Sequence, residues 1–168
     1  MGYASPEPLA GRHFVDDFDC GEPALDDWLK HHARPAQAAG SARTFVTTSD
    51  GAAVVCYYAL AAAQVEPDEA TTRLLKGEPQ RRAVPAVLLA RLAVDHRHQG
   101  GGVGRSLLQD AVLRCLQAAD SIGVRAMLIH AKHEQARAWY QQYGFELSPT
   151  DPLHLMLLVK DLRAFVDR

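Results

Sequence analysis

The sequence lacks any apolar run long enough to cross a membrane. Its longest apolar stretch, "AAVVCYYALAAA" (52–63), has 12 residues, whereas a membrane-spanning helix needs about 20. The first residues, "MGYASPEPLAGRH", have neither the basic start nor the apolar core of a secretory signal. The three cysteines, Cys20, Cys56 and Cys115, are odd in number and widely spaced, which argues against a disulfide framework. We therefore expect a cytoplasmic protein with no membrane association.

A strong net charge is also absent, because the formal net charge is only −2. That value alone does not predict a nucleic-acid partner. The charges are segregated, however: residues 16–27 carry six carboxylates and no base, and residues 30–43 carry bases and no acid. We interpret one set of basic residues as candidate ligands of RNA phosphates. The set is Lys30, Arg34, Arg43, Arg81 and Arg82. The alternative is two faces that differ only in how they are solvated.

Hydrophobic periodicity and turn residues predict alternating helices and strands. The expected elements are a helix over 24–33 that Pro35 interrupts, a hairpin of strands 42–48 and 52–60 around Ser49-Asp-Gly51, a polar connection over 66–85, a buried strand over 86–94, a helix over 107–119, a central strand over 123–131, a helix over 134–144 closed by Gly144, and a final strand over 153–160. This order is typical of a mixed α/β (α+β) fold. A chain of 168 residues fits one domain, 1–168.

The stretch "DHRHQGGGVGRS" (95–106) joins the buried strand to the helix that follows it. Its spacing fits neither a Walker loop nor the dinucleotide fingerprint G-x-G-x-x-G. It does fit Q-x-x-G-x-G, with Gln99, Gly102 and Gly104. Glycines at the start of a helix let several backbone N–H groups converge on one anion, and the helix dipole favours a diphosphate there. A glycine-rich turn without a ligand is the alternative.

Two motifs carry a resemblance to a known family. "LARLAVDHRHQGGGVGRSLLQDA" resembles the cofactor motif of GNAT-type N-acetyltransferases, and "HEQARAWYQQYGFE" resembles their closing helix with its Ala-x-x-x-Tyr-x-x-x-Gly-Phe pattern. "FDCGEPALDDWL" and "SPTDPLHLMLLVKDL" are similar to one branch, the tRNA-acetylating toxins of bacterial toxin–antitoxin pairs. The resemblance extends from about Pro6 to Leu162. It implies the GNAT fold, a central mixed, mostly antiparallel twisted sheet flanked by helices.

The resemblance also implies acetyl-CoA as co-substrate and assigns roles to residues. Tyr140 would protonate the departing thiolate of CoA, and backbone groups of Leu92, Ala93 and Val94 would pair with the pantetheine arm. The other cofactor-binding candidates lie in the loop and at the place where the family often carries Asn. They are Arg97, Gln99, Gly100, Gly101, Gly102, Val103, Gly104, Arg105, Ser106 and His133. Adjacent His31 and His32 have the wrong spacing for two metal ligands on a helix, and we expect no metal.

The acceptor amine decides how strong a base the enzyme needs. An α-amino group titrates near 8 and a lysine near 10.4, and an ester draws the value lower still. An aminoacyl ester can therefore lose its proton to water. The strand before the loop offers no Glu and only Asp95 at its end, which fits an acceptor of this kind.

Three functions remain open from the sequence alone. The first is a toxin that acetylates the α-amino group of aminoacyl-tRNA and so blocks translation, with a homodimer and a ribbon-helix-helix-type antitoxin implied by the resemblance. The second is a GNAT enzyme for a small-molecule or protein amine, which the charge of −2 favours. The third is a non-catalytic CoA-binding partner protein.

Overall fold

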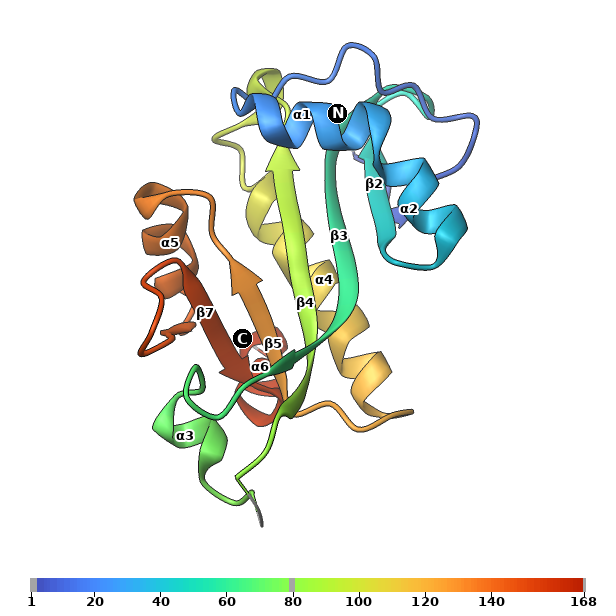
Figure 1. Cartoon of the computed structure of the whole chain (residues 1–168). Coiled ribbons are helices and arrows are strands. Elements are labelled where there is room, and N and C mark those ends of the chain that lie inside the picture. The colour runs from blue at the N-terminus through green and yellow to red at the C-terminus, as the bar shows by residue number, and fades with distance from the viewer. Residues whose placement is uncertain (1–2, 79–80, 168) are drawn as a thin grey trace. The chain divides into compact units, whose positions relative to one another are not determined.

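The computed structural model describes residues 3–78 and 81–167. It divides into two units, each considered by itself. The first unit consists of 3–61 and 90–111, and the second of 62–89 and 112–167 with the described residues only. The elements β3, β4 and α4 begin in one unit and end in the other. Figure 1 labels the main elements along the chain.

The strands form one sheet with the order β1-β2-β3-β4-β5-β7-β6. Their bounds are β1 Glu7–Pro8, β2 Arg43–Thr48, β3 Val54–Val65, β4 Val84–Val94, β5 Ala126–His130, β6 Glu146–Leu147 and β7 His154–Leu158. β1–β2, β2–β3, β5–β7 and β6–β7 pair antiparallel, and β4–β5 pair in parallel. The expected mixed, mostly antiparallel sheet is thereby confirmed.

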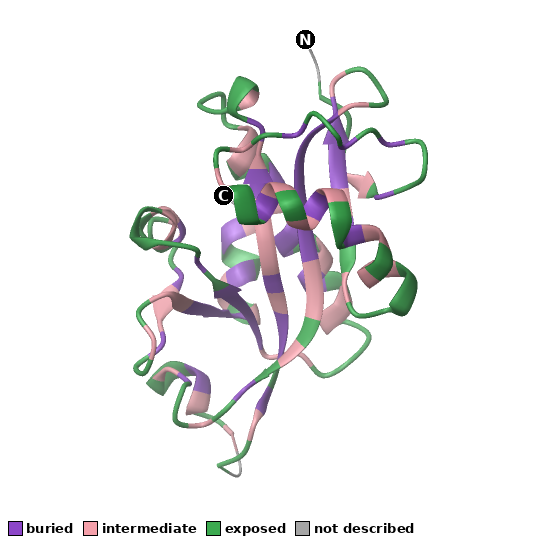
Figure 2. Ribbon diagram, turned by 45° about the horizontal axis from the view of Figure 1, so that its top comes forward, coloured by how far each residue is buried: buried purple, intermediate pink, exposed green. Residues whose placement is uncertain are grey.

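The helices lie between these strands in the sequence, except α6, which follows the last strand. Their bounds are α1 Pro23–His31, α2 Ala33–Ala39, α3 Thr72–Leu75, the short 3-10 helix η1 His96–His98, α4 Val103–Ala119, α5 Glu134–Gln141 and α6 Val159–Val166. In Figure 2 the buried residues follow the strands, and many residues of α1 and α2 are exposed.

In the first unit helices pack on both faces of the sheet. Successive side chains of a strand point to opposite sides, so two adjacent residues of β3 contact different helices. Tyr57 packs among the core residues of α1 and α2, and its hydroxyl donates to the Leu25 carbonyl at 2.7 Å. Tyr58, the next residue, points the other way and donates to a carboxylate oxygen of Asp110 on α4. β3 therefore anchors α1 on one face of the sheet and the first half of α4 on the other.

The second unit has its own core. Val65, Leu74 and Val84 cluster with Leu128 of β5 and Met156 of β7. Thr71 caps α3 by accepting a hydrogen bond from Leu74 N at 3.2 Å, and α3 then buries Leu74 against these strands. The predicted polar connection over 66–85 thus contains a short helix with one anchoring residue.

Several predicted boundaries were wrong for identifiable reasons. Pro35 does not end the helical region, because the break falls at His32 and α2 carries Pro35 in its first turn, where no N–H donor is required. α4 begins at Val103, not at 107, so Gly104 lies inside it. The final strand ends at Leu158, and Lys160 belongs to α6. The predicted hairpin is confirmed, and its turn is held by Asp50 Oδ1, which accepts from Ala52 N and Ala53 N.

Candidate functional site

The glycine loop between η1 and α4 has the backbone that an anion site needs. Gly100 and Gly102 have φ values of +85° and +83°, a region that side chains other than glycine rarely adopt. Gly102 also starts the helix, because its carbonyl accepts from Ser106 N at 3.2 Å. A pocket of about 380 Å³ borders the loop along Gly101, Gly102 and Ser106. The first backbone N–H groups of α4, which have no partner within the helix, therefore begin beside open space.

Asp95, directly before the loop, is a fixed structural carboxylate. Its side chain is fully buried. Its Oδ1 accepts from Arg97 N at 2.9 Å and from Arg97 Nε at 2.8 Å, and its Oδ2 accepts from Arg97 Nη2 at 2.9 Å and from Asp19 N at 3.0 Å. The Arg97 guanidinium beside it holds the pKa of this carboxyl well below its usual range. Asp95 is therefore hydrogen-bonded to Arg97 and Asp19 and ionised at neutral pH.

The same contacts change the interpretation of Arg97. Two of its guanidinium nitrogens face Asp95, and Nη2 also donates to the Asp17 carbonyl at 3.2 Å. These contacts join the loop to the segment before α1, and the predicted contact of Arg97 with the cofactor stays a prediction. Arg97 is a positioning residue for the loop.

Gln99 also holds the loop in place. Its Nε2 donates to the Val94 carbonyl at 2.8 Å and to the Cys20 carbonyl at 3.1 Å. His96 adds a further link, because its backbone N donates to the Asp19 carbonyl at 2.8 Å. The glutamine of the Q-x-x-G-x-G pattern thus fixes the loop to the end of β4 and to the segment before α1.

The three β4 residues expected to bind the cofactor alternate across the strand. Ala93 is buried in the core of the first unit, and Leu92 and Val94 are half-buried on the other side. The Val94 carbonyl already accepts the Gln99 side chain. Arg91, which the sequence analysis did not single out, lies 4.3 Å from the centre of the Trp28 ring, and burial lowers its pKa. The sequence held only two signals for a role of Arg91. It lies two residues before Ala93, on the same face of the strand, and its immediate neighbours are apolar.

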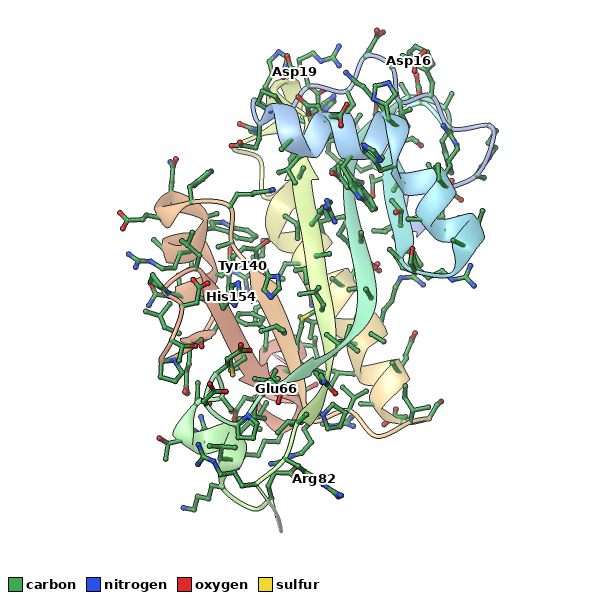
Figure 3. All side chains as sticks on the ribbon, viewed as in Figure 1. Asp16, Asp19, Glu66, Arg82, Tyr140 and His154 are labelled. Atoms are coloured by element: carbon green, nitrogen blue, oxygen red, sulfur yellow. The ribbon has the colours of Figure 1, made fainter. Side chains whose placement is uncertain are left out.

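The second unit contains Tyr140 on α5 (Figure 3). Its ring is buried against Trp139 and Phe145, with ring centres 5.0 and 6.2 Å away. Within residues 3–78 and 81–167 its hydroxyl makes no hydrogen bond. Burial raises the pKa of Tyr140 further above its ordinary value. The hydroxyl therefore stays protonated at neutral pH and is available as a donor.

His133 has a structural role that its sequence position did not reveal. It is the N-cap residue of α5, and its Nδ1 accepts from Ala136 N at 3.1 Å. An Asn at this position would offer a side-chain acceptor for the same cap. The prediction that His133 contacts the cofactor stays a prediction.

The sequence analysis did not predict a pair of stacked imidazoles in the second unit. His130 and His154 face each other across β5 and β7, with ring centres 3.9 Å apart and planes 17° apart. His154 Nε2 lies 3.4 Å from Asp151 Oδ2, and Figure 3 labels His154. Burial, and then the neighbouring His154, lower the pKa of His130. Only the strand register brings the two together, so nothing in their spacing along the chain identified them.

The predicted RNA-binding residues are distributed over both units. Lys30, Arg34 and Arg43 belong to the first, and Arg81 and Arg82 to the second (Figure 3 labels Arg82). Arg34 Nη2 donates to the carbonyls of His13 at 2.6 Å and Ala10 at 3.1 Å and so holds the N-terminal segment in place, and the predicted RNA contact of Arg34 stays a prediction. Arg43, Arg81 and Arg82 are exposed and Lys30 is half-buried.

Across 3–78 and 81–167 no three His, Cys, Asp or Glu side chains come together in a way that could hold a metal ion. In the same part of the chain no helix is both long and apolar enough to cross a membrane.

The comparisons with known proteins agree with the motifs. A family model described as an acetyltransferase (GNAT) domain matches residues 40–147. A protein of Mycobacterium tuberculosis (strain ATCC 25618 / H37Rv) named tRNA-acetylating toxin is 50% identical over 165 residues, which cover 98% of each chain. A crystal structure of a KacT mutant matches with a TM-score of 0.89 at 25% identity, covering 98% of this chain and 99% of that one. A crystal structure of AtaTR bound with AcCoA matches with a TM-score of 0.79 at 25% identity, covering 95% and 96%. The chain therefore belongs to the GNAT family of acetyltransferases.

Proposed function

We propose that this protein transfers the acetyl group of acetyl-CoA to the α-amino group of aminoacyl-tRNA and thereby blocks translation. The observation that carries the proposal is the glycine loop that opens α4, with glycines at positive φ and a pocket beside it. The relative at 50% identity, which is named for the same activity, supports the choice of substrate.

The loop is suited to the diphosphate of the co-substrate. Backbone amides around Gly100–Gly104 and the start of α4 supply uncharged donors, and the positive end of the helix dipole adds to them. The Asp95–Arg97 pair and Gln99 keep this backbone in shape before the ligand arrives, which lowers the entropic cost of binding. Val103, Arg105 and Ser106 complete the set proposed to contact the co-substrate.

Acetyl transfer then requires one bond to form and one to break. The neutral amine attacks the thioester carbon, the new C–N bond forms, and the C–S bond to CoA breaks. A backbone N–H within Leu92–Val94 would stabilise the oxyanion, and the Tyr140 hydroxyl would donate its proton to the leaving sulfur. A buried tyrosine without a partner is suited to this role because it remains protonated at neutral pH. The proton lost by the amine passes to water and, finally, back to the phenolate.

Partners are proposed from the same resemblance. Lys30, Arg43, Arg81 and Arg82 are proposed to contact RNA phosphates, which Arg34 is not free to do through the nitrogen bound to Ala10 and His13. We further propose a single catalytic domain over 1–168, a homodimer in the cytoplasm, and neutralisation by a ribbon-helix-helix-type antitoxin.

The decisive experiment incubates the purified protein with radiolabelled acetyl-CoA and total charged tRNA. We expect label on the RNA that mild base removes, because base cleaves the aminoacyl ester. Uncharged tRNA, free amino acids and a lysine-containing peptide are the controls. Rapid acetylation of a free amine or of the peptide, with charged tRNA unlabelled, would replace this proposal with the small-molecule or protein substrate. CoA binding without any turnover would indicate a non-catalytic partner.

A further inference from the structure

An open pocket of about 590 Å³ lies in the second unit, and none of the site residues assigned above lines it. The end of α3 and the turn after it, the residues before β5, and the first turn of α6 line it. Four of its lining residues are basic: Arg73, Lys76, Arg125 and Lys160. These residues come from three separate stretches of the sequence, so no single basic run indicated the whole pocket.

The two arginines are paired with carboxylates. Arg125 Nη1 lies 2.7 Å from Glu78 Oε1 and donates to the Leu74 carbonyl at 3.1 Å. Arg73 lies 3.0 Å from Asp161 Oδ2 and 3.4 Å from Glu146 Oε1. The Arg125–Glu78 pair ties the turn after α3 to the residue before β5, and the Arg73 contacts tie α3 to α6 and β6. The three carboxylates outnumber the two arginines by one.

The two lysines supply the surplus positive charge. Lys76 and Lys160 are both exposed, and within the described residues neither ammonium group has an ion pair or hydrogen bond. Because the pocket's arginines already face the nearby acids, the lysine charges are available to a ligand. A lysine is a compact, strongly hydrated point charge that binds phosphate without requiring the flat geometry of an arginine pair.

The first turn of α6 adds to this positive field. Val159 and Lys160 line the pocket, and no described side chain caps the helix. Val159 N donates to the Arg125 carbonyl at 2.8 Å, which fixes the start of the helix beside Arg125. The remaining N–H groups of the turn have no partner within the helix, and its dipole favours an anion at this end.

We infer that this pocket binds a phosphate group of the RNA backbone between Lys76 and Lys160, an inference that rests on the proposed function. The pocket lies at the start of β5, and α5 with Tyr140 follows the other end of that strand. The five residues of β5 separate those ends by roughly 13 Å. The phosphate is therefore one that lies away from the aminoacyl end of the substrate.

The test compares substrates with and without remote phosphates. Lys76→Ala, Lys160→Ala and the double variant are assayed on full-length charged tRNA and on a short fragment, 3′-aminoacyl adenosine, which carries no phosphate. Arg163→Ala is the matched control, because it removes one positive charge from α6 that is paired with Asp120 at 3.1 Å and lies outside the pocket. Far-UV circular dichroism and thermal melts verify that each variant is folded.

We expect KM for full-length tRNA to rise about fivefold at 0.15 M salt when both lysines are removed, and by less for either one alone, with kcat unchanged. This value follows from a salt slope of about 0.9 for one phosphate contact relative to 1 M salt. The slope of log affinity against log salt should fall by about one in the double variant. Arg163→Ala should leave the slope unchanged, and KM for the short fragment should be the same in all variants.

Two results would overturn the inference. One is lysine variants that match Arg163→Ala on full-length tRNA. The other is unchanged tRNA binding together with loss of affinity for an acidic probe such as poly-glutamate, which would assign the pocket to an acidic protein segment. If the wild-type protein acetylates no charged tRNA, yet binds uncharged tRNA with the expected dependence on both lysines, the proposed substrate is wrong and the phosphate pocket stands.

Discussion

The glycine loop of the first unit and the α3–β5–α6 pocket of the second use their polar side chains in opposite ways. Around the loop, Asp95, Arg97 and Gln99 bind one another or the neighbouring backbone. In the second unit, the Tyr140 hydroxyl and the ammonium groups of Lys76 and Lys160 have no partner among the described residues. The difference teaches that a basic residue near a loop is not by itself a phosphate ligand. The contacts that such a residue already makes decide whether it holds the site in shape or can bind a ligand.

The largest effect is expected for Tyr140→Phe, which removes a group that is free to act. The rate of acetyl transfer should fall by at least about 100-fold, the usual contribution of a positioned general acid. The melting temperature and CoA affinity should change little, because the ring stays in place. Single-turnover kinetics and calorimetry with CoA measure the two effects.

Tyr143→Phe is the matched control for that variant, since Tyr143 packs on Trp139 and Phe165 nearby. It should retain nearly full activity. Equal rates for both variants and the wild type would remove Tyr140 from the mechanism.

Asp95→Asn tests a residue of the opposite kind, one whose side chain is fully engaged in holding the loop in shape. The substitution leaves Arg97 without its charged partner, and hydrogen bonds to charged groups contribute about 2 kcal/mol. We expect that loss in the free energy of unfolding at pH 7, measured by urea denaturation, together with weaker CoA binding.

The pH dependence of the same variant has a definite sign. The folded pKa of Asp95 is below its unfolded value near 4, so its contribution is fully present above that pH and is lost as the pH falls toward the folded pKa. The wild type should therefore lose stability relative to Asp95→Asn between about pH 5 and pH 2. Parallel curves for the two proteins would contradict the ion pair.

Gly102→Ala should produce a smaller effect through backbone strain. Nothing lies within 4 Å of an added methyl group, so the cost arises from φ at +83° alone. A left-handed conformation costs a residue with a side chain about 1 kcal/mol. Gly101→Ala is the control, because Gly101 has an ordinary φ and equally open space, and its melting temperature should match that of the wild type.

The smallest effect is expected at the stacked histidines. The folded pKa of His130 is lowered, so protonation below the unfolded value near 6.5 opposes folding, and stability decreases as the pH falls through that region. His130→Gln should flatten this dependence between pH 7.5 and 5.5 by less than about 0.5 kcal/mol, because the ring is partly exposed and solvent screens its charge. Urea denaturation at the two pH values measures it, and an unchanged difference would contradict the lowered pKa.

Local sequence patterns were sufficient to predict much of the fold. The alternating apolar residues of β2 and β3 and the Asp-Gly turn predicted the hairpin, and the glycine loop and the Tyr140 pattern indicated the GNAT family. The chain alone did not predict α6, because "LMLLVKDL" reads as one apolar strand until Val159 N turns to bond the Arg125 carbonyl. It also did not predict the contacts of Arg34 and Arg97 with the N-terminal segment and with Asp95.

The sequence by itself determined the motifs whose chemistry depends on neighbours in the chain. These are the glycines that free the backbone at the start of α4, and the tyrosine set four residues before Gly144. Only the tertiary structure decided which charges are neutralised and which are left over. Ion pairs such as Arg125–Glu78 join residues 47 positions apart, and Lys76 and Lys160 meet at one pocket because β5 and α6 fold beside α3. Electrostatic interactions depend on distance in space, and distance along the chain does not report it.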